Sequence, residues 1–215
     1  MAAKKQVAKA AGGRQAAYTA RNRAALIKAG QEVLADIGPQ ATIEQLSEHA
    51  HVSPTTIYKY FENKENLFAE ALSEIWEAKI AWANRSRTAG DRVETTLDTG
   101  RKLLWAKEHD PFFAKIIRNI LSVNQSFVVH SVGAEGKKVF KELAASGELK
   151  NDDFDKRWIL WTNLLAGLFV SVYVTEELKA AEAEIAMGIG LSVWGLSEAK
   201  AKKIISRKLS FAPAE

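Results

Sequence analysis

Hydroxyl-bearing and basic side chains gather in one short stretch of the chain, and their chemistry suits a polyanion. They are Thr42, Ser53, Thr55, Thr56, Tyr58, Lys59, Tyr60 and Lys64. Hydroxyl and ammonium groups hydrogen-bond to phosphate oxygens and to acceptor atoms on base edges. Thr55 and Lys59 stand one helical turn apart, so on a helix they share a face that can reach the bases. These residue types predict contact with nucleic acid.

Two short helices are predicted to position these side chains. Thr42 and Gln45 form a capping-box pattern that starts the first helix. Ser53 is a preferred N-cap residue and Pro54 suits the first helical position, so a second helix follows almost at once. Each helix is expected to span about eight residues, as in a helix-turn-helix.

Longer helices are predicted on either side of this pair. Residues 21–37 carry apolar side chains at helical spacing and are followed by Gly38-Pro39, which stops a helix. Asn63 caps a further helix that links two domains. A braced pair of this kind can lay its second helix in the major groove of DNA, which is about 12 Å wide.

The stretch TIEQLSEHAHVSPTTIYKYFENKENLF, residues 42–68, resembles the DNA-binding domain of the TetR family of bacterial transcriptional regulators. With the preceding helix, the resemblance covers residues 21–68. It implies a homodimer that binds a pseudo-palindromic double-stranded operator, expected to be a repressor that a small effector releases. By resemblance, phosphates are held by Thr42, Thr56, Tyr58, Tyr60 and Lys64, and bases are faced by Pro54, Thr55 and Lys59. Ser53 completes the expected DNA-binding set.

One position in the predicted turn departs from the family pattern. His51 stands where the family usually has Gly, at a point where we expect a positive φ. Histidine tolerates that region better than most residues with a Cβ, although at some cost in conformational energy. We therefore expect the turn to form with local strain.

The rest of the chain predicts an all-α protein of three parts. Residues 1–20 are expected to be a flexible basic arm, because the first 28 residues hold seven basic and no acidic residues in a chain of net charge +4. The helix-turn-helix domain spans 21–68. A larger helical-bundle domain for ligand binding and dimerisation spans 69–212, with further helices at about 91–108, 111–123, 124–146, 153–176, 180–195 and 198–209.

This larger domain holds all six tryptophans of the chain. An apolar pocket for a small molecule is typically lined by aromatic side chains, although such residues equally form ordinary core. The resemblance implies an effector pocket, and the candidate residues are Trp105, Phe113, Phe127 and Trp161. Few charged side chains are expected to point inward, which favours an apolar or aromatic effector.

Residues 158–175 contain no charge over 18 positions, which is near the lower limit for a membrane span. A helix that is apolar all round can equally lie buried between subunits, and we favour that interpretation. One face, with Trp158 and Trp161, is expected to join the subunit's own core. The opposite face is expected to contact a second subunit in a four-helix bundle made by the helices at 153–176 and 180–195. Its residues are Asn163, Ala166, Gly167, Val170 and Val174.

Other functions find little support in the sequence. It contains none of the motifs G-x-S-x-G, H-E-x-x-H, G-x-G-x-x-G or the P-loop, so we expect no enzymatic activity and no cofactor. No metal site is expected, since His49 and His51 do not share a helix face. The absence of cysteine fits a cytoplasmic protein. The alternative is a helical protein that binds a small molecule or lipid without recognising specific DNA.

Overall fold

The structure is a computed structural model that describes residues 2–86 and 90–211. These residues contain helices and no strand, so the all-α prediction is confirmed. The helices are α1 (Ala2–Asp36), α2 (Ile43–His49), α3 (Pro54–Tyr58), α4 (Lys64–Arg85), α5 (Arg92–His109), α6 (Pro111–Val123), α7 (Phe127–Ala145), α8 (Phe154–Tyr173), α9 (Ala180–Gly190), the 3-10 helix η1 (Leu191–Trp194) and α10 (Glu198–Ser206). The chain forms two compact units, an N-terminal unit over Met1–Trp76 and a C-terminal unit over Glu77–Glu215.

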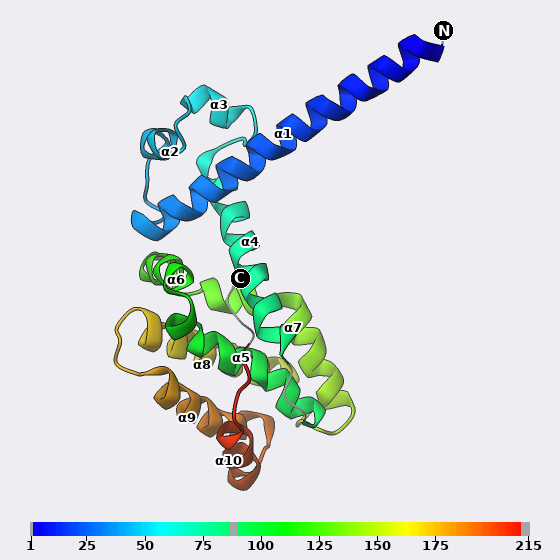
Figure 1. Ribbon diagram of the computed structural model, residues 1–215. Coiled ribbons are helices and arrows are strands. Elements are labelled where there is room, and N and C mark those ends of the chain that lie inside the picture. The colour runs from blue at the N-terminus through cyan, green and yellow to red at the C-terminus, as the bar shows by residue number, and fades with distance from the viewer. Residues whose placement is uncertain (1, 87–89, 212–215) are drawn as a thin grey trace. The chain divides into compact units, whose positions relative to one another are not determined.

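The N-terminal unit is built on a small apolar core that α1 to α4 share. Figure 1 shows α2 and α3 on one side of α1. Residues at helical spacing fill the core, and they include Val33, Leu34, Leu46, Ile57 and Leu67, none of which exposes any surface. Gly30 lets α1 and α4 approach closely, because a Cβ there would lie 2.3 Å from the Leu67 side chain. The shared core sets the positions of α2 and α3 against α1 and α4.

The structure differs from the expectation at residues 1–20. The helix that was predicted to begin at Arg21 begins at Ala2, so residues 2–20 continue α1 and do not form a separate arm. Its composition explains the difference, since Ala, Lys, Gln and Arg are strong helix formers and alanine recurs throughout the segment. The basic residues make this segment positively charged, but a positive charge does not determine whether the backbone is helical.

Aromatic side chains form much of the core of the C-terminal unit. Phe140 on α7 lies with its ring centre 5.5 Å from that of Trp158 and 5.1 Å from that of Trp194. Trp161 joins the same cluster at 6.0 Å from Phe140. The α8 face that was predicted to join the core is indeed buried, and it comprises Trp158, Trp161, Leu165, Leu168 and Val172.

The expectation that few charged side chains point inward was wrong. Arg101 on α5 is 1% exposed, and its guanidinium pairs with Asp98 at 3.2 Å and with Glu184 of α9. It also donates to the carbonyl oxygens of Ile205 and Arg207, at 2.9 and 2.8 Å. The buried guanidinium of Arg101 is thus both paired and hydrogen-bonded, as burial requires. The partners lie far apart in the sequence, so local patterning could not show them.

The uncharged stretch over residues 158–175 corresponds to most of α8. Among the described residues, none of the helices is both long and apolar enough to cross a membrane. Polar side chains on α8 bond to their own helix, as where the Thr162 hydroxyl donates to the Trp158 carbonyl at 2.9 Å.

Candidate nucleic-acid interface

Side-chain caps start both short helices of the N-terminal unit, as the sequence predicts. The Thr42 hydroxyl accepts from the Gln45 amide at 3.2 Å, and the Gln45 side chain accepts from the Thr42 amide at 2.8 Å. At α3 the Ser53 hydroxyl accepts from the Thr56 amide at 3.2 Å, with Pro54 in the first turn. Both hydroxyls lie at the surface, where they retain the capacity for a further hydrogen bond.

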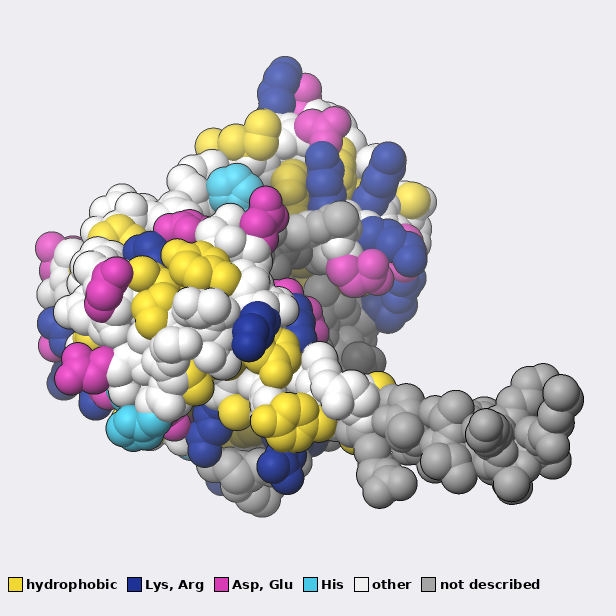
Figure 2. Space-filling view, turned by 90° about the horizontal axis from the view of Figure 1, so that it is seen from above, with side chains coloured by type: hydrophobic (Ala, Val, Ile, Leu, Met, Phe, Trp, Pro, Cys, Tyr) yellow, Lys and Arg dark blue, Asp and Glu magenta, His cyan; other side chains and the backbone are white. Residues whose placement is uncertain are grey.

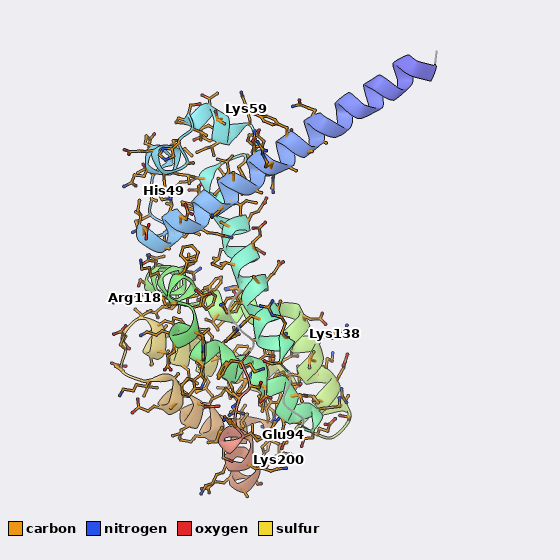
Figure 3. The ribbon with its side chains drawn as sticks, viewed as in Figure 1. His49, Lys59, Glu94, Arg118, Lys138 and Lys200 are labelled. Carbon is orange, nitrogen blue, oxygen red and sulfur yellow. The ribbon has the colours of Figure 1, made fainter. Side chains whose placement is uncertain are left out.

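The α3 helix presents one outer face and buries the other. Ile57 is completely buried beneath it, whereas Thr55, Tyr58 and Lys59 are exposed and Tyr58 keeps 52% of its surface. In Figure 3, Lys59 lies at the outer end of α3. At five residues α3 is shorter than the expected eight, because Lys59 already serves as its C-cap. The outer face still brings Thr55 and Lys59 to one side of a short helix.

The turn between α2 and α3 has the backbone conformation that the sequence predicts. His51 has a φ of 53°, in the left-handed region that disfavours residues with a Cβ. Just before this turn, the His49 Nε2 lies 2.9 Å from a Glu32 carboxylate oxygen on α1. His49 therefore fastens α2 to α1, a role that the sequence analysis missed.

Two of the expected phosphate-binding residues already have partners inside the unit. The Lys64 ammonium donates to the Ala41 carbonyl at 2.6 Å, just before the cap at Thr42. The Tyr60 hydroxyl accepts from the Asn22 side-chain amide of α1 at 3.0 Å. These contacts hold α4 and α3 against their neighbours. Both groups can still take part in DNA binding, since a tyrosine hydroxyl also donates and an ammonium has three donors.

The surface around α2 and α3 is not uniformly basic. Figure 2 shows Lys and Arg side chains separated by acidic and uncharged ones on the face seen from above. Arg23 of α1 pairs with Glu70 and lies over the Phe61 ring at 4.7 Å. This surface offers a ligand hydroxyl groups and single lysines. Among its described residues, it does not offer a broad positive patch.

Comparison with known proteins agrees with this geometry. The family described as bacterial regulatory proteins, tetR family, matches residues 26–71, from α1 through both short helices to α4. Over these residues the chain matches the TetR family. It therefore carries the helix-turn-helix DNA-binding domain of that family's transcriptional regulators. No curated protein matches the sequence.

Solved structures of TetR-type regulators share the fold over most of the chain. RolR in complex with resorcinol has 18% identity, a TM-score of 0.68, and coverage of 91% of this chain and 98% of its own. A TetR-family transcriptional regulator from Haemophilus influenzae has 16% identity, a TM-score of 0.55, and coverage of 81% and 96%. A TetR-family regulator from Streptomyces coelicolor has 20% identity, a TM-score of 0.51, and coverage of 87% and 96%. At such identities the likeness concerns the fold of both units.

The four aromatic residues proposed for an effector pocket do not line one opening in this structure. Phe113 is fully buried against Tyr173, with ring centres 6.3 Å apart, and Trp161 packs on Phe140. Trp105 is partly exposed, and its indole N–H donates to Glu184 at 3.1 Å. Phe127 begins α7 and is partly exposed. The hollow between Leu97, Phe140 and Trp194 is too tight to admit a water molecule and includes none of the four.

The predicted partner face of α8 is divided between surface and core. Asn163 and Gly167 are exposed, Val170 and Val174 are half-buried, and Ala166 is buried within its own chain. Large apolar side chains that the sequence analysis did not select are the most exposed ones on α8 and α9. They are Ile159 at 58%, Leu160 at 60%, Ile185 at 56% and Ile189 at 74%.

The glycines of α9 serve contacts within the chain. A Cβ on Gly190 would lie 2.0 Å from the Leu164 side chain of α8, and one on Gly188 would lie 2.9 Å from Ile205. The absence of a side chain at these two positions lets α9 pack closely against α8 and the end of α10.

Proposed function

We propose that this TetR-family regulator is a homodimeric repressor that binds a pseudo-palindromic operator and is released by a small apolar or aromatic effector. The observation that carries the DNA-binding part is the exposed face of α3, with Thr55, Tyr58 and Lys59 held outward by the buried Ile57. A short helix with such a face, braced by α1 and α2, fits the major groove.

Roles are assigned to the interface by position. Pro54, Thr55 and Lys59 face the bases, since they lie on or next to the exposed side of α3. Thr42 and Ser53 cap helices whose first amides are directed at phosphates, and Thr56, Tyr58, Tyr60 and Lys64 add hydroxyl and ammonium contacts. Phosphate contacts fix the position on DNA, whereas the α3 face determines which sequence binds.

Dimerisation is proposed to occur through the exposed apolar surface of α8 and α9. Ile159, Leu160, Ile185 and Ile189 lie on these helices and would bury their surface against a second copy. A twofold pair of such surfaces makes a four-helix bundle and presents two α3 helices to two half-sites.

The effector response is supported by the C-terminal unit and by one related structure. RolR is seen in complex with the ligand resorcinol, a small aromatic compound. In this chain Trp105, Phe113, Phe127 and Trp161 offer aromatic rings, and binding at Phe113 and Trp161 requires a rearrangement because these two are buried. A ligand can shift the DNA-binding equilibrium only by its differential affinity for the two states.

A binding selection against genomic fragments tests the proposal. The protein should retain a small number of fragments that contain an inverted repeat, and its affinity should fall steeply with salt as bound counterions are released. Random DNA should bind far more weakly. If the protein binds all fragments with equal affinity, or binds no fragment, the proposal is wrong. The alternative of a helical small-molecule or lipid-binding protein then remains.

A further inference from the structure

The described chain ends with an aromatic ring set into an aromatic cage. Phe211 stacks on Trp82 of α4 with ring centres 5.8 Å apart and planes 21° apart. Its ring centre lies 4.2 Å from that of His109 and 6.5 Å from that of Trp105, both on α5. Trp82 itself is 3% exposed, whereas His109 is exposed and Trp105 partly so. The cage therefore has a buried floor and a side open to solvent.

Phe211 reaches the cage on a non-helical segment that follows α10. Figure 1 shows the chain turning back from α10 alongside α5. Arg101 holds the beginning of this segment by its hydrogen bonds to the Ile205 and Arg207 carbonyls. The Ser86 hydroxyl holds its far end by donating to the Ser210 carbonyl at 2.7 Å. Release of Phe211 from the cage therefore requires the Ser86–Ser210 hydrogen bond to open, while the hydrogen bonds of Arg101 at the start of the segment can remain.

Charged residues strengthen the anchor. The Arg207 guanidinium lies 3.6 Å from a carboxylate oxygen of Glu94 and 3.5 Å from one of Asp98. The Lys203 ammonium lies 3.2 Å from the other Glu94 carboxylate oxygen. In Figure 3, Glu94 and Lys200 lie together where α5 and α10 meet. Burial opposes ionisation of Glu94, but a backbone hydrogen bond and the Lys203 ammonium lower its pKa below the usual value. The start of the segment is thus held by ion pairs, whereas its end is held by ring stacking and by the Ser86–Ser210 hydrogen bond.

We propose that the cage of Trp82, Trp105 and His109 is a binding site for one planar aromatic ring, which the chain's own Phe211 fills in this structure. A free aromatic compound and Phe211 then compete for the same floor. A tethered competitor acts at an effective concentration in the millimolar range, so only a ligand that stacks well displaces it. Through this competition the segment that carries Phe211 sets the ligand concentration needed for the effector response. This last step rests on the proposed function.

The stacking geometry selects the ligand class. A ring parallel to the Trp82 indole gains offset stacking, and the exposed imidazole of His109 lies beside it, where it can hydrogen-bond to a ring hydroxyl. A saturated ring of similar size has no flat π face and cannot stack on the Trp82 indole in this way. The site therefore favours small phenolic compounds over aliphatic alcohols.

Fluorine NMR titration of 4-fluorophenol into the full-length protein without DNA tests the cage. Phe211→Ala should bind the probe about tenfold more tightly than the unaltered chain, because the competing ring is gone. Phenol should displace the probe and cyclohexanol should not. Phe112→Ala is the matched control, since it removes an equally large ring that is 40% exposed on α6 and is not one of the cage rings.

Adding His109→Ala to Phe211→Ala removes one wall at an exposed position and should return the affinity to the level of the unaltered chain or below. Equal probe affinity in the unaltered chain and Phe211→Ala would overturn the proposal, as would tightening by Phe112→Ala or equal displacement by cyclohexanol. Since DNA is absent, these outcomes leave operator binding to be judged by the fragment selection alone.

Discussion

At the scale of single residues, the two lysines of the interface differ in what holds them. Lys59 is exposed at the end of α3, whereas the Lys64 ammonium donates to the Ala41 carbonyl at 2.6 Å. An exposed side chain next to the proposed base-reading face can alter specificity. A lysine that is tied to the backbone before the proposed phosphate-binding cap is expected to act on all DNA sequences alike.

Alanine substitution separates these two roles. Lys59→Ala should change the preferred operator sequence, with a loss of about 1–3 kcal/mol at the affected base pair. Lys64→Ala should weaken all sites equally, reduce the slope of log affinity against log salt by about one per subunit, and lower stability by about 1 kcal/mol through the lost hydrogen bond. Competition binding with operator and random DNA at several salt concentrations measures both. An equal loss on operator and random DNA for Lys59→Ala would refute its assignment to the bases.

His51 carries a strained backbone in the turn before α3. Its φ of 53° costs about 1 kcal/mol for a residue with a Cβ, and glycine adopts this conformation freely. His51→Gly should therefore keep or slightly raise the melting temperature and retain operator binding, whereas His51→Val should lower stability. A clear decrease in melting temperature for the glycine variant would indicate that the imidazole makes a stabilising contact.

Local residue patterns predicted the caps and the turn of α2 and α3 well and the long-range pairs poorly. The caps at Thr42 and Ser53 and the positive φ at His51 depend on neighbours within a few residues, so the sequence alone indicates them. The partners of Lys64 and Arg101 depend on how distant helices pack. Their contacts therefore required the three-dimensional structure.

At the scale of elements, helix ends show where prediction succeeds. The helix expected at about 111–123 is α6, and it begins at Pro111 with the Asp110 carboxylate accepting from the Phe113 amide at 2.9 Å. The lengths of α1 and α3 were predicted less well, since helix propensity extends the first and an early C-cap shortens the second. Helix existence follows from apolar periodicity, whereas helix length depends on competition between adjacent elements.

The same carboxylate joins α4 to the start of α6. An Asp110 carboxylate oxygen lies 2.5 Å from the Lys79 ammonium. Lys79 is only 8% exposed, and its ammonium also lies over the rings of Trp82 and Phe113. Burial opposes ionisation of Asp110, but the hydrogen bonds from Lys79 and from the Phe113 amide lower its pKa below the usual 3.8. A lowered pKa means that the ionised form favours the folded state.

Asp110→Asn tests this charge, because asparagine preserves the cap and removes the negative partner of Lys79. The unaltered chain should be more stable than Asp110→Asn at pH 7. Its advantage should persist above the usual pKa of 3.8 and disappear as the pH falls through the lower folded-state value. Melting temperatures from pH 7 to pH 3 measure the difference. An advantage that remains constant to the lowest pH would show that the ion pair does not contribute.

At the scale of the whole molecule, the proposed operator recognition requires a second copy of the chain. A single α3 helix reads only a few base pairs, and two half-sites about one DNA turn apart require a twofold dimer. The expected partner residues Val170 and Val174 are half-buried, whereas Leu160 on α8 and Ile189 on α9 are largely exposed at 60% and 74%. These two side chains can be changed without opening the core of the subunit.

Leu160→Asp and Ile189→Asp should each convert the dimer to a folded monomer, because a charge would be buried without a partner at the subunit contact. The affinity for the operator should then fall at least about a hundredfold, since a subunit bound at one half-site no longer holds a second subunit near the other half-site. Val123→Asp on α6 provides the matched control, as Val123 is 64% exposed and lies outside α8 and α9. Sedimentation and operator titration measure the two effects. If Leu160→Asp and Ile189→Asp still sediment as dimers, the subunit contact is made by other helices, and the exposed apolar surface of α8 and α9 must have another partner.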